Sequence, residues 1–208
     1  LVIWPETSFP TYFEDNTASE TLRNWVRNTL KTNLLFGAYS RSNGTYQSSA
    51  YVIDENANTI ATFTKHRMLI FGEYLPSFLE FARKFSPDIG NMHPGPKPTS
   101  QKVLGGNLVV STCLDGIHPW DFQNTFKDAN VEENWNLHIN LTNDSWYGPT
   151  IERFQHLNLQ QMRAIELRTP LVRVTNSGIS ALILQDGKIY QQTPIDEESV
   201  PIWDVPLV

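Results

Sequence analysis

At 208 residues the chain is long enough for one domain with a substantial core, and its 40% apolar and 18% charged residues indicate a folded globular protein rather than a disordered one. The net charge of −6 argues against nucleic acid as the main partner. A single cysteine excludes an internal disulfide, and no stretch approaches the roughly 20 apolar residues that span a bilayer.

The start of the chain predicts a strand, a helix and further strands. Residues 1–4 are apolar and form an expected buried strand that runs into Pro5 and Glu6, so Glu6 lies just past a strand end. Apolar residues at helical spacing predict a helix over residues 18–31. The strands expected after it cover residues 33–39, 46–53 and 59–64.

The middle of the chain predicts a lysine at a strand end and an irregular connection after it. Lys65 closes the strand over 59–64, and Phe71-Gly72-Glu73 is typical of a turn that presents a carboxylate. A helix is expected over residues 77–85. Residues 86–100 contain four prolines and two glycines, which predicts a long irregular loop. Such a loop is either functional or a tolerated surface insertion.

Cys113 is expected where a strand pair, residues 101–104 and 107–111, gives way to a helix. A thiol on a sharp strand-to-helix turn is well placed for nucleophilic attack, because the following backbone N–H groups can lower its pKa or hold an oxyanion. The alternative is a buried structural cysteine, since free cysteine is among the most buried residue types.

The second half of the chain predicts alternating helices and strands. Helices are expected over residues 118–128 and 152–167, and a strand over 135–141 leads into a polar and aromatic loop that contains Trp146 and Tyr147. The remaining strands are expected at residues 171–175, 179–184 and 188–190. This alternation, with hairpins between some strands, indicates an α/β fold with two mixed sheets packed face to face beneath outer helices.

Glu6, Lys65 and Cys113 all stand at predicted strand ends, and together they could perform acyl transfer without a histidine. A thiol is mostly protonated at neutral pH, so a neighbouring carboxylate could take its proton and later return it to a leaving group. A lysine ammonium beside the reacting carbonyl would stabilise a tetrahedral oxyanion.

Other kinds of site have weaker support in the sequence. The histidines are scattered and form neither an H-E-x-x-H pair nor a Cys/His cluster, so no metal site is expected. There is no G-x-S-x-G elbow and no glycine-rich phosphate loop, so neither a serine hydrolase of that type nor a nucleotide cofactor is expected. A Cys–His pair through His118 remains an alternative.

Several motifs occur in the order that is typical of one known superfamily. They are Ile3-Trp4-Pro5-Glu6, Lys65 with Phe71-Gly72-Glu73-Tyr74-Leu75-Pro76, Cys113, Asn143-Asp144-Ser145-Trp146-Tyr147-Gly148, Gln155-His156-Leu157, Arg163-Ala164-Ile165-Glu166, and Arg173 to Ser180. On these motifs the chain resembles the nitrilase (carbon–nitrogen hydrolase) superfamily, and within it the nitrilase-like domain of the bacterial apolipoprotein N-acyltransferases. The resemblance covers nearly the whole chain.

The resemblance implies an α-β-β-α sandwich with a Glu-Lys-Cys triad. It implies that Glu6 is the general base, Lys65 the oxyanion stabiliser and Cys113 the nucleophile. Glu73 is implied as a second, supporting carboxylate near the lysine. Further candidates are Asp115, as a supporting acid, and Trp146 and Tyr147, as a substrate-site loop. Neither a metal nor a cofactor is implied.

The reaction that the resemblance implies moves a fatty acyl chain in two steps. Cys113 takes the chain from a phospholipid as a thioester, and the N-terminal amine of a diacylglyceryl-cysteine lipoprotein then accepts it. The implied location is the periplasmic face of the bacterial inner membrane, through membrane segments that are absent from this chain. We accordingly expect residues 1–208 to be a single nitrilase-like domain, a fragment without the family's first strand and helix.

Two departures from the family pattern keep other functions open. Leu114-Asp115 stands where the family usually has a Tyr-Glu pair, and Leu69-Ile70 stands where Val-Pro usually precedes the Phe. The alternatives are a soluble nitrilase-type amidase, which would transfer the acyl group to water, and a non-catalytic relative that kept the fold.

Overall fold

The computed structural model describes residues 1–14, 17–42, 44–85, 90–126 and 135–207, and two β-sheets face each other within them. The first sheet has the strand order β1-β3-β4-β5, with β2 also paired to β3. β1 and β2 run parallel to β3, while β4 and β5 are antiparallel to their neighbours. The strands are β1 (Val2–Ile3), β2 (Phe9–Tyr12), β3 (Leu34–Ser42), β4 (Thr45–Ile53) and β5 (Thr59–Thr64).

The second sheet has the order β11-β10-β9-β8-β7-β6 and is also mixed. Its central strands β7, β8 and β9 are parallel, and the pairs at either side are antiparallel. The strands are β6 (Gln101–Val103), β7 (Gly106–Thr112), β8 (Asn136–Thr142), β9 (Leu171–Thr175), β10 (Ala181–Ile183) and β11 (Ile189–Gln192). Parallel strands gather their carboxyl ends at one edge, which is where α/β proteins place their chemistry.

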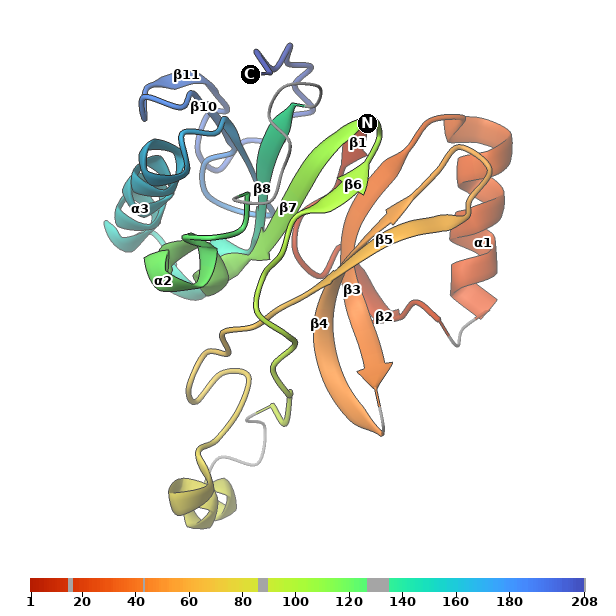
Figure 1. The fold of residues 1–208 in the computed structure, drawn as a ribbon. Helices are drawn as coiled ribbons and strands as arrows, with labels where there is room; N and C mark the ends of the chain where they lie inside the picture. The colour runs from red at the N-terminus through yellow and green to blue at the C-terminus, as the bar shows by residue number, and fades with distance from the viewer. Residues whose placement is uncertain (15–16, 43, 86–89, 127–134, 208) are drawn as a thin grey trace.

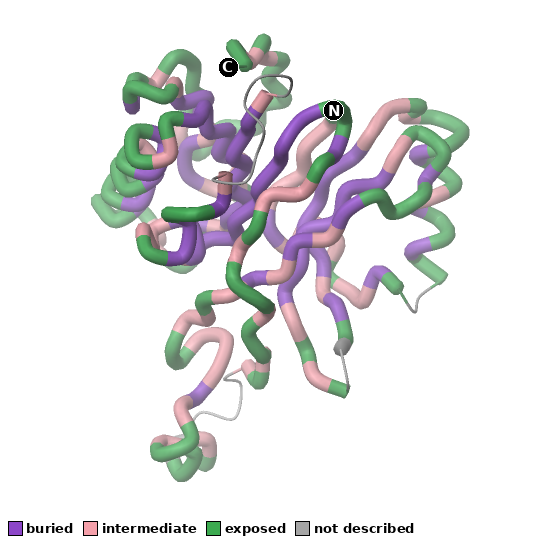
Figure 2. Tube along the Cα trace, viewed as in Figure 1, coloured by how far each residue is buried: buried purple, intermediate pink, exposed green. Residues whose placement is uncertain are grey.

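Helices cover the outer faces of both sheets, as Figure 1 shows. α1 (Thr17–Trp25) and η1 (Val26–Leu30) pack on the first sheet, while α2 (Pro119–Phe122) and α3 (Glu152–Leu167) lie over the second. Between the sheets, inward-facing residues of successive strands form the main core, for example Val52, Leu108 and Ile139. The buried segments in Figure 2 follow these strands. The predicted α-β-β-α sandwich of two mixed sheets is therefore confirmed.

Most predicted elements are present, and the differences concern helix type and one strand. The helix over 152–167 and the strands over 59–64 and 171–175 are confirmed at their predicted bounds. The helix expected over 18–31 changes from α to π at Val26. The helix expected over 77–85 is present as the 3₁₀-helix η2 (Ser77–Lys84).

Two further expectations about the elements need correction. The helix expected over 118–128 is only the short α2, which ends at Phe122; residues 127 and 128 lie outside the described part of the chain. β2 was not predicted at all. The remaining elements are two 3₁₀-helices that follow strand ends, η3 (Cys113–Ile117) and η4 (Asp144–Tyr147). No helix among the described residues is long and apolar enough to cross a membrane.

Candidate active site

Three strand ends bring the predicted triad residues to one buried cluster. Glu6 follows β1, Lys65 follows β5, and Cys113 follows β7. Lys65 is 1% exposed, and its Nζ lies 3.3 Å from Oε1 of Glu6 and 2.5 Å from Oε1 of Glu73. Glu6, Lys65 and Glu73 all influence the ionisation of the Cys113 thiol. The cluster therefore joins the four side chains at the meeting point of the two sheets.

The backbone around Glu6 is held by both sheets. Gly37 of β3 permits the close approach, because a Cβ there would lie 2.6 Å from the Thr7 nitrogen and 2.9 Å from Cα of Glu6. From the end of β9, Asn176 donates its side-chain amide to the Glu6 carbonyl at 2.8 Å. Burial raises the pKa of the Glu6 carboxyl, which outweighs the lowering effect of Lys65. A raised pKa suits a carboxylate that takes up and returns a proton.

Lys65 is a buried ammonium held between two carboxylates. Burial alone would lower its pKa, but Glu6, Cys113 and Glu73 together raise the pKa above its ordinary value. The second oxygen of Glu73 accepts the backbone N–H of Leu69 at 2.7 Å, which fixes that carboxylate. The two carboxylates thus keep Lys65 charged and hold its ammonium in one orientation.

Cys113 occupies a strained turn directly after β7. Its φ is +50°, in the left-handed region that residues with a Cβ rarely adopt. Burial and the neighbouring Glu6 raise the pKa of the thiol to about 11, although Lys65 works in the opposite direction. The sequence left open whether the backbone N–H groups lower this pKa or hold an oxyanion; the net pKa is raised, because burial outweighs every lowering effect. A thiol in this state needs a base to react at neutral pH, and the carboxylate of Glu6 is near enough for its charge to act on the pKa of the thiol.

Asp115, in η3, links the cysteine turn to the lysine strand. Its carboxylate accepts the backbone N–H groups of His66, at 3.0 Å, and of Arg67. These two residues directly follow Lys65, so the carboxylate ties the end of β5 to the turn that carries Cys113. Burial raises the pKa of Asp115 to about 6, against the opposing effect of the two N–H donors.

The aromatic loop after β8 lies partly against the cluster. Trp146 is 71% exposed, whereas Tyr147 is half-buried, with its ring centroid 5.8 Å from that of His156 in an edge-to-face arrangement. Burial, followed by the nearby Cys113, raises the pKa of Tyr147 to about 12. Tyr147 therefore lies near the thiol, and Trp146 faces solvent.

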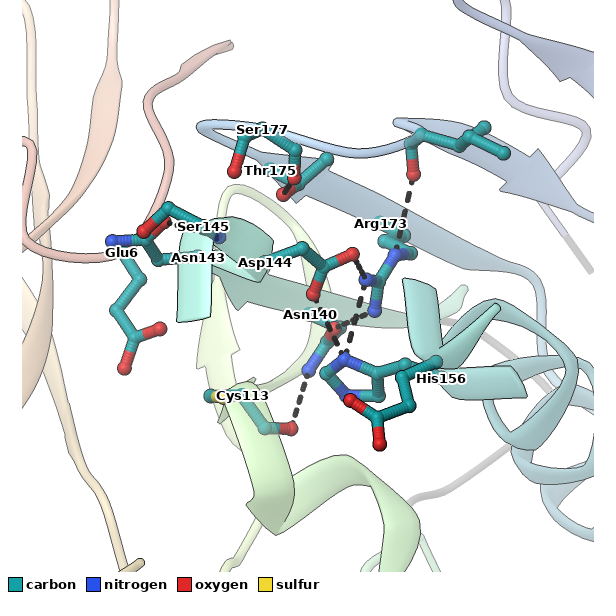
Figure 3. Close-up of polar contacts among 12 residues, drawn as sticks. Glu6, Cys113, Asn140, Asn143, Asp144, Ser145, His156, Arg173, Thr175 and Ser177 are labelled. Carbon is teal, nitrogen blue, oxygen red and sulfur yellow. Dashed lines mark hydrogen bonds and ion pairs between the residues drawn. The ribbon is translucent and has the colours of Figure 1, made fainter. Parts of the chain in front are cut away.

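Some polar partners of the site were not singled out from the sequence, although all of them except Asn140 lie inside the motifs that carry the resemblance. They are Asn176 beside Glu6, and the buried residues Asn140, Asp144, His156 and Arg173 beneath the cysteine turn (Figure 3). The possible partner His118 makes no hydrogen bond to Cys113 in the described structure. Among the described residues, no group of three or more His, Cys, Asp or Glu could hold a metal ion.

Comparison with known proteins identifies the family. The sequence of the whole chain, residues 1–208, matches the carbon–nitrogen hydrolase family, and the chain belongs to it. It is similar to the apolipoprotein N-acyltransferase of Bdellovibrio bacteriovorus, with 33% identity over 95% of this chain and 38% of that protein. The protein of the same name from Geobacter metallireducens is 31% identical over 96% of this chain and 39% of its own length. The chain thus spans well under half of these relatives.

Solved structures share the fold at lower identity. XC1258 from Xanthomonas campestris, a CN-hydrolase superfamily protein with an arsenic adduct in its active site, has a TM-score of 0.67 and 16% identity, over 95% of this chain and 74% of that chain. A mutant amidase from Nesterenkonia sp. AN1, with the acetamide moiety of fluoroacetamide added at its active site cysteine, has a TM-score of 0.60 and 16% identity, over 86% and 63%. Family membership supports an enzymatic activity for this chain.

Proposed function

We propose that this chain is the catalytic domain of an N-acyltransferase that acts on lipoproteins, with Glu6, Lys65 and Cys113 as its triad. The observation that supports the proposal most is the buried contact of Lys65 with Glu6 and Glu73 next to Cys113. The similarity to relatives named apolipoprotein N-acyltransferase supports acyl transfer to a lipoprotein over the other reactions of the family.

In the proposed first step, Glu6 takes the proton from Sγ of Cys113, and the thiolate attacks an ester carbonyl of a phospholipid. Lys65 stabilises the oxyanion. The carbon–oxygen bond breaks, the leaving alkoxide takes the proton from Glu6, and a lysophospholipid departs from a Cys113 thioester. In the second step the α-amine of a diacylglyceryl-cysteine lipoprotein attacks the thioester. Glu6 accepts the amine proton and returns it to the leaving thiolate.

A lipid acyl donor is favoured by a projecting segment, residues 69–85, which we call the arm. It extends from the sandwich in Figure 1, and in Figure 2 it is drawn mainly as exposed and intermediate segments, with Leu75 buried. Within η2, Phe78 and Phe81 are 76% and 64% exposed, and Phe85 is 83% exposed. Large exposed apolar patches mark interaction sites. We infer that the arm faces the membrane, and we place the whole protein at the periplasmic side of the bacterial inner membrane.

Mass spectrometry of the intact chain after incubation with phospholipid vesicles tests the proposed function. We expect an acyl adduct on Cys113 that hydroxylamine removes and that a diacylglyceryl-cysteine peptide accepts. Cys113→Ala and Lys65→Met should give no adduct, while Lys102→Met, at an exposed lysine of β6, should react normally. Ammonia release from small amides, with no adduct from phospholipid, would overturn the proposal in favour of an amidase.

A further inference from the structure

A row of polar side chains lies beneath α3, where an apolar sheet face is the usual arrangement. Ser111, Asn140 and Arg173 occupy paired positions on the adjacent parallel strands β7, β8 and β9. Each of the three is 0% exposed. A buried polar group costs free energy unless its hydrogen bonds are made, and a buried charge costs more unless it is paired. The buried charge of Arg173 therefore requires partners, and these partners indicate its role.

Arg173 uses each of its three nitrogens on a different segment, as Figure 3 shows. Nε donates to the carbonyl of Ile179 at 3.2 Å, Nη1 to Oδ1 of Asn140 at 3.2 Å, and Nη2 to Oδ2 of Asp144 at 2.5 Å. Burial would raise the pKa of Asp144, but His156 and Arg173 hold this pKa below its ordinary value. The buried charge of Arg173 is thus neutralised by an ionised carboxylate.

The contact of Arg173 with Asn140 leads to the cysteine turn. Nδ2 of Asn140 donates to Oγ of Ser111 at 3.0 Å and to the carbonyl of Cys113 at 3.4 Å. The side chain of Asn140 is therefore held on one side by Arg173 and holds the backbone of Cys113 on the other. That backbone has positive φ, which persists only where its surroundings determine it.

The contact of Arg173 with Asp144 leads to the aromatic loop. Asp144 is the first residue of η4, which carries Trp146 and Tyr147. Its other oxygen accepts Nδ1 of His156 at 3.0 Å, and the His156 ring packs against Tyr147. Arg173 therefore contacts the supports of both catalytic-site turns, η3 and η4.

We propose that Arg173 is a positioning residue that fixes the Cys113 turn and the Trp146–Tyr147 turn relative to each other. It touches neither the thiol nor, in the proposed mechanism, the substrate. This role goes beyond the proposed function and rests on it only in that the proposed function makes the two turns part of the catalytic site. Lysine could neutralise Asp144, but its single ammonium lacks the planar fork that reaches three acceptors.

Hydrogen exchange measured by mass spectrometry tests the link directly, without substrate. In Arg173→Lys we expect the peptides that contain His118 and Gly148 to lose protection together, because their N–H groups close η3 and η4 on Asp115 and Ser145. Arg163→Lys is the matched control, since Arg163 is a buried arginine of α3 that pairs with Glu166. It should leave both peptides unchanged.

Kinetics separate positioning from simple destabilisation. In the parent chain, Glu6→Gln should slow the alkylation of Cys113 by iodoacetamide by about tenfold. In the Arg173→Lys background the same substitution should slow alkylation by less than about twofold, because the turn no longer holds the thiol against Glu6. If Arg173→Lys does not fold, Asn140→Ala replaces it. That variant keeps the Arg173–Asp144 pair and should loosen η3 alone.

Distinct outcomes would overturn this inference and the proposed function. The inference alone is overturned if a folded Arg173→Lys chain keeps its hydrogen-exchange protection in either peptide. It is also overturned if Asn140→Ala leaves the protection of the η3 peptide unchanged. Coupled loss of protection with no effect of Glu6→Gln in the parent chain supports the link between the turns and contradicts the triad.

Discussion

The side chain of Asp115 is one methylene shorter than the glutamate that the family pattern favours, and its contacts give it a clear task. Its carboxylate accepts the backbone N–H groups of the two residues after Lys65 and so holds the end of β5 against the turn that carries Cys113. In Asp115→Asn, one oxygen becomes an NH₂ group that faces N–H donors. We expect the free energy of unfolding to fall by about 1–3 kcal/mol and acyl transfer by tenfold or more.

Chemical denaturation and the adduct assay measure these two effects of Asp115→Asn. The control is Asp186→Asn, because Asp186 is exposed in the turn between β10 and β11 and, among the described residues, accepts a local N–H, that of Lys188. Equal stability and equal activity of both variants would show that the carboxylate of Asp115 does not clamp the site.

The raised pKa of Glu6 gives a prediction about pH. A general base works only when deprotonated, so the rate of Cys113 alkylation should fall as the pH drops through the raised pKa of Glu6, above the ordinary glutamate value of 4.5. At higher pH the thiolate itself, with a pKa of about 11, adds a second rise. Glu6→Gln should remove the acidic limb and keep the alkaline one. An acidic limb that survives in Glu6→Gln belongs to another group.

At the scale of elements, the turn at Cys113 stores backbone strain that can be measured. A residue with a Cβ in the left-handed region costs about 1–2 kcal/mol, which glycine avoids. We expect Cys113→Gly to be more stable than Cys113→Ala by about 1 kcal/mol in denaturant unfolding. At Val109, in the extended part of β7, the order should reverse, because glycine weakens a strand. Cys113→Ala at least as stable as Cys113→Gly would contradict a strained turn.

Element types were predictable from the sequence where periodicity and length agree. Sixteen residues of clear amphipathic pattern gave α3 at its observed bounds. The segment of η2 was predicted to be helical, but its eight residues are too few to separate a period of 3.0 from one of 3.6, so its 3₁₀ type could not be predicted. β2 was not predicted. Its four residues include Pro10, which is unfavourable inside a sheet but tolerated at a sheet edge, where β2 pairs irregularly with β3.

At the scale of the whole molecule, the site depends on strand ends that lie far apart in the sequence. The sequence predicted Glu6, Lys65 and Cys113 as strand-end residues, and the resemblance assigned their roles; their meeting is a product of the two-sheet topology. The buried row around Arg173 was not predicted, because a polar residue inside an apolar strand gives no indication of its partner. Only the pairing of β7, β8 and β9 places Ser111, Asn140 and Arg173 side by side.

The arm connects this site to its surroundings, because its base holds Glu73 against Lys65 while its tip exposes aromatic rings. We expect the double variant Phe78→Ser/Phe81→Ser to keep the unfolding temperature of the parent chain, since neither ring is buried. The affinity for phosphatidylglycerol vesicles should fall by about tenfold. This loss corresponds to less free energy than the full burial of one phenylalanine side chain contributes. Co-sedimentation with vesicles measures this binding. Tyr190→Ser, at an exposed aromatic residue of β11, is the control and should bind as the parent chain does. Unchanged binding of the double variant would mean that the arm does not face lipid.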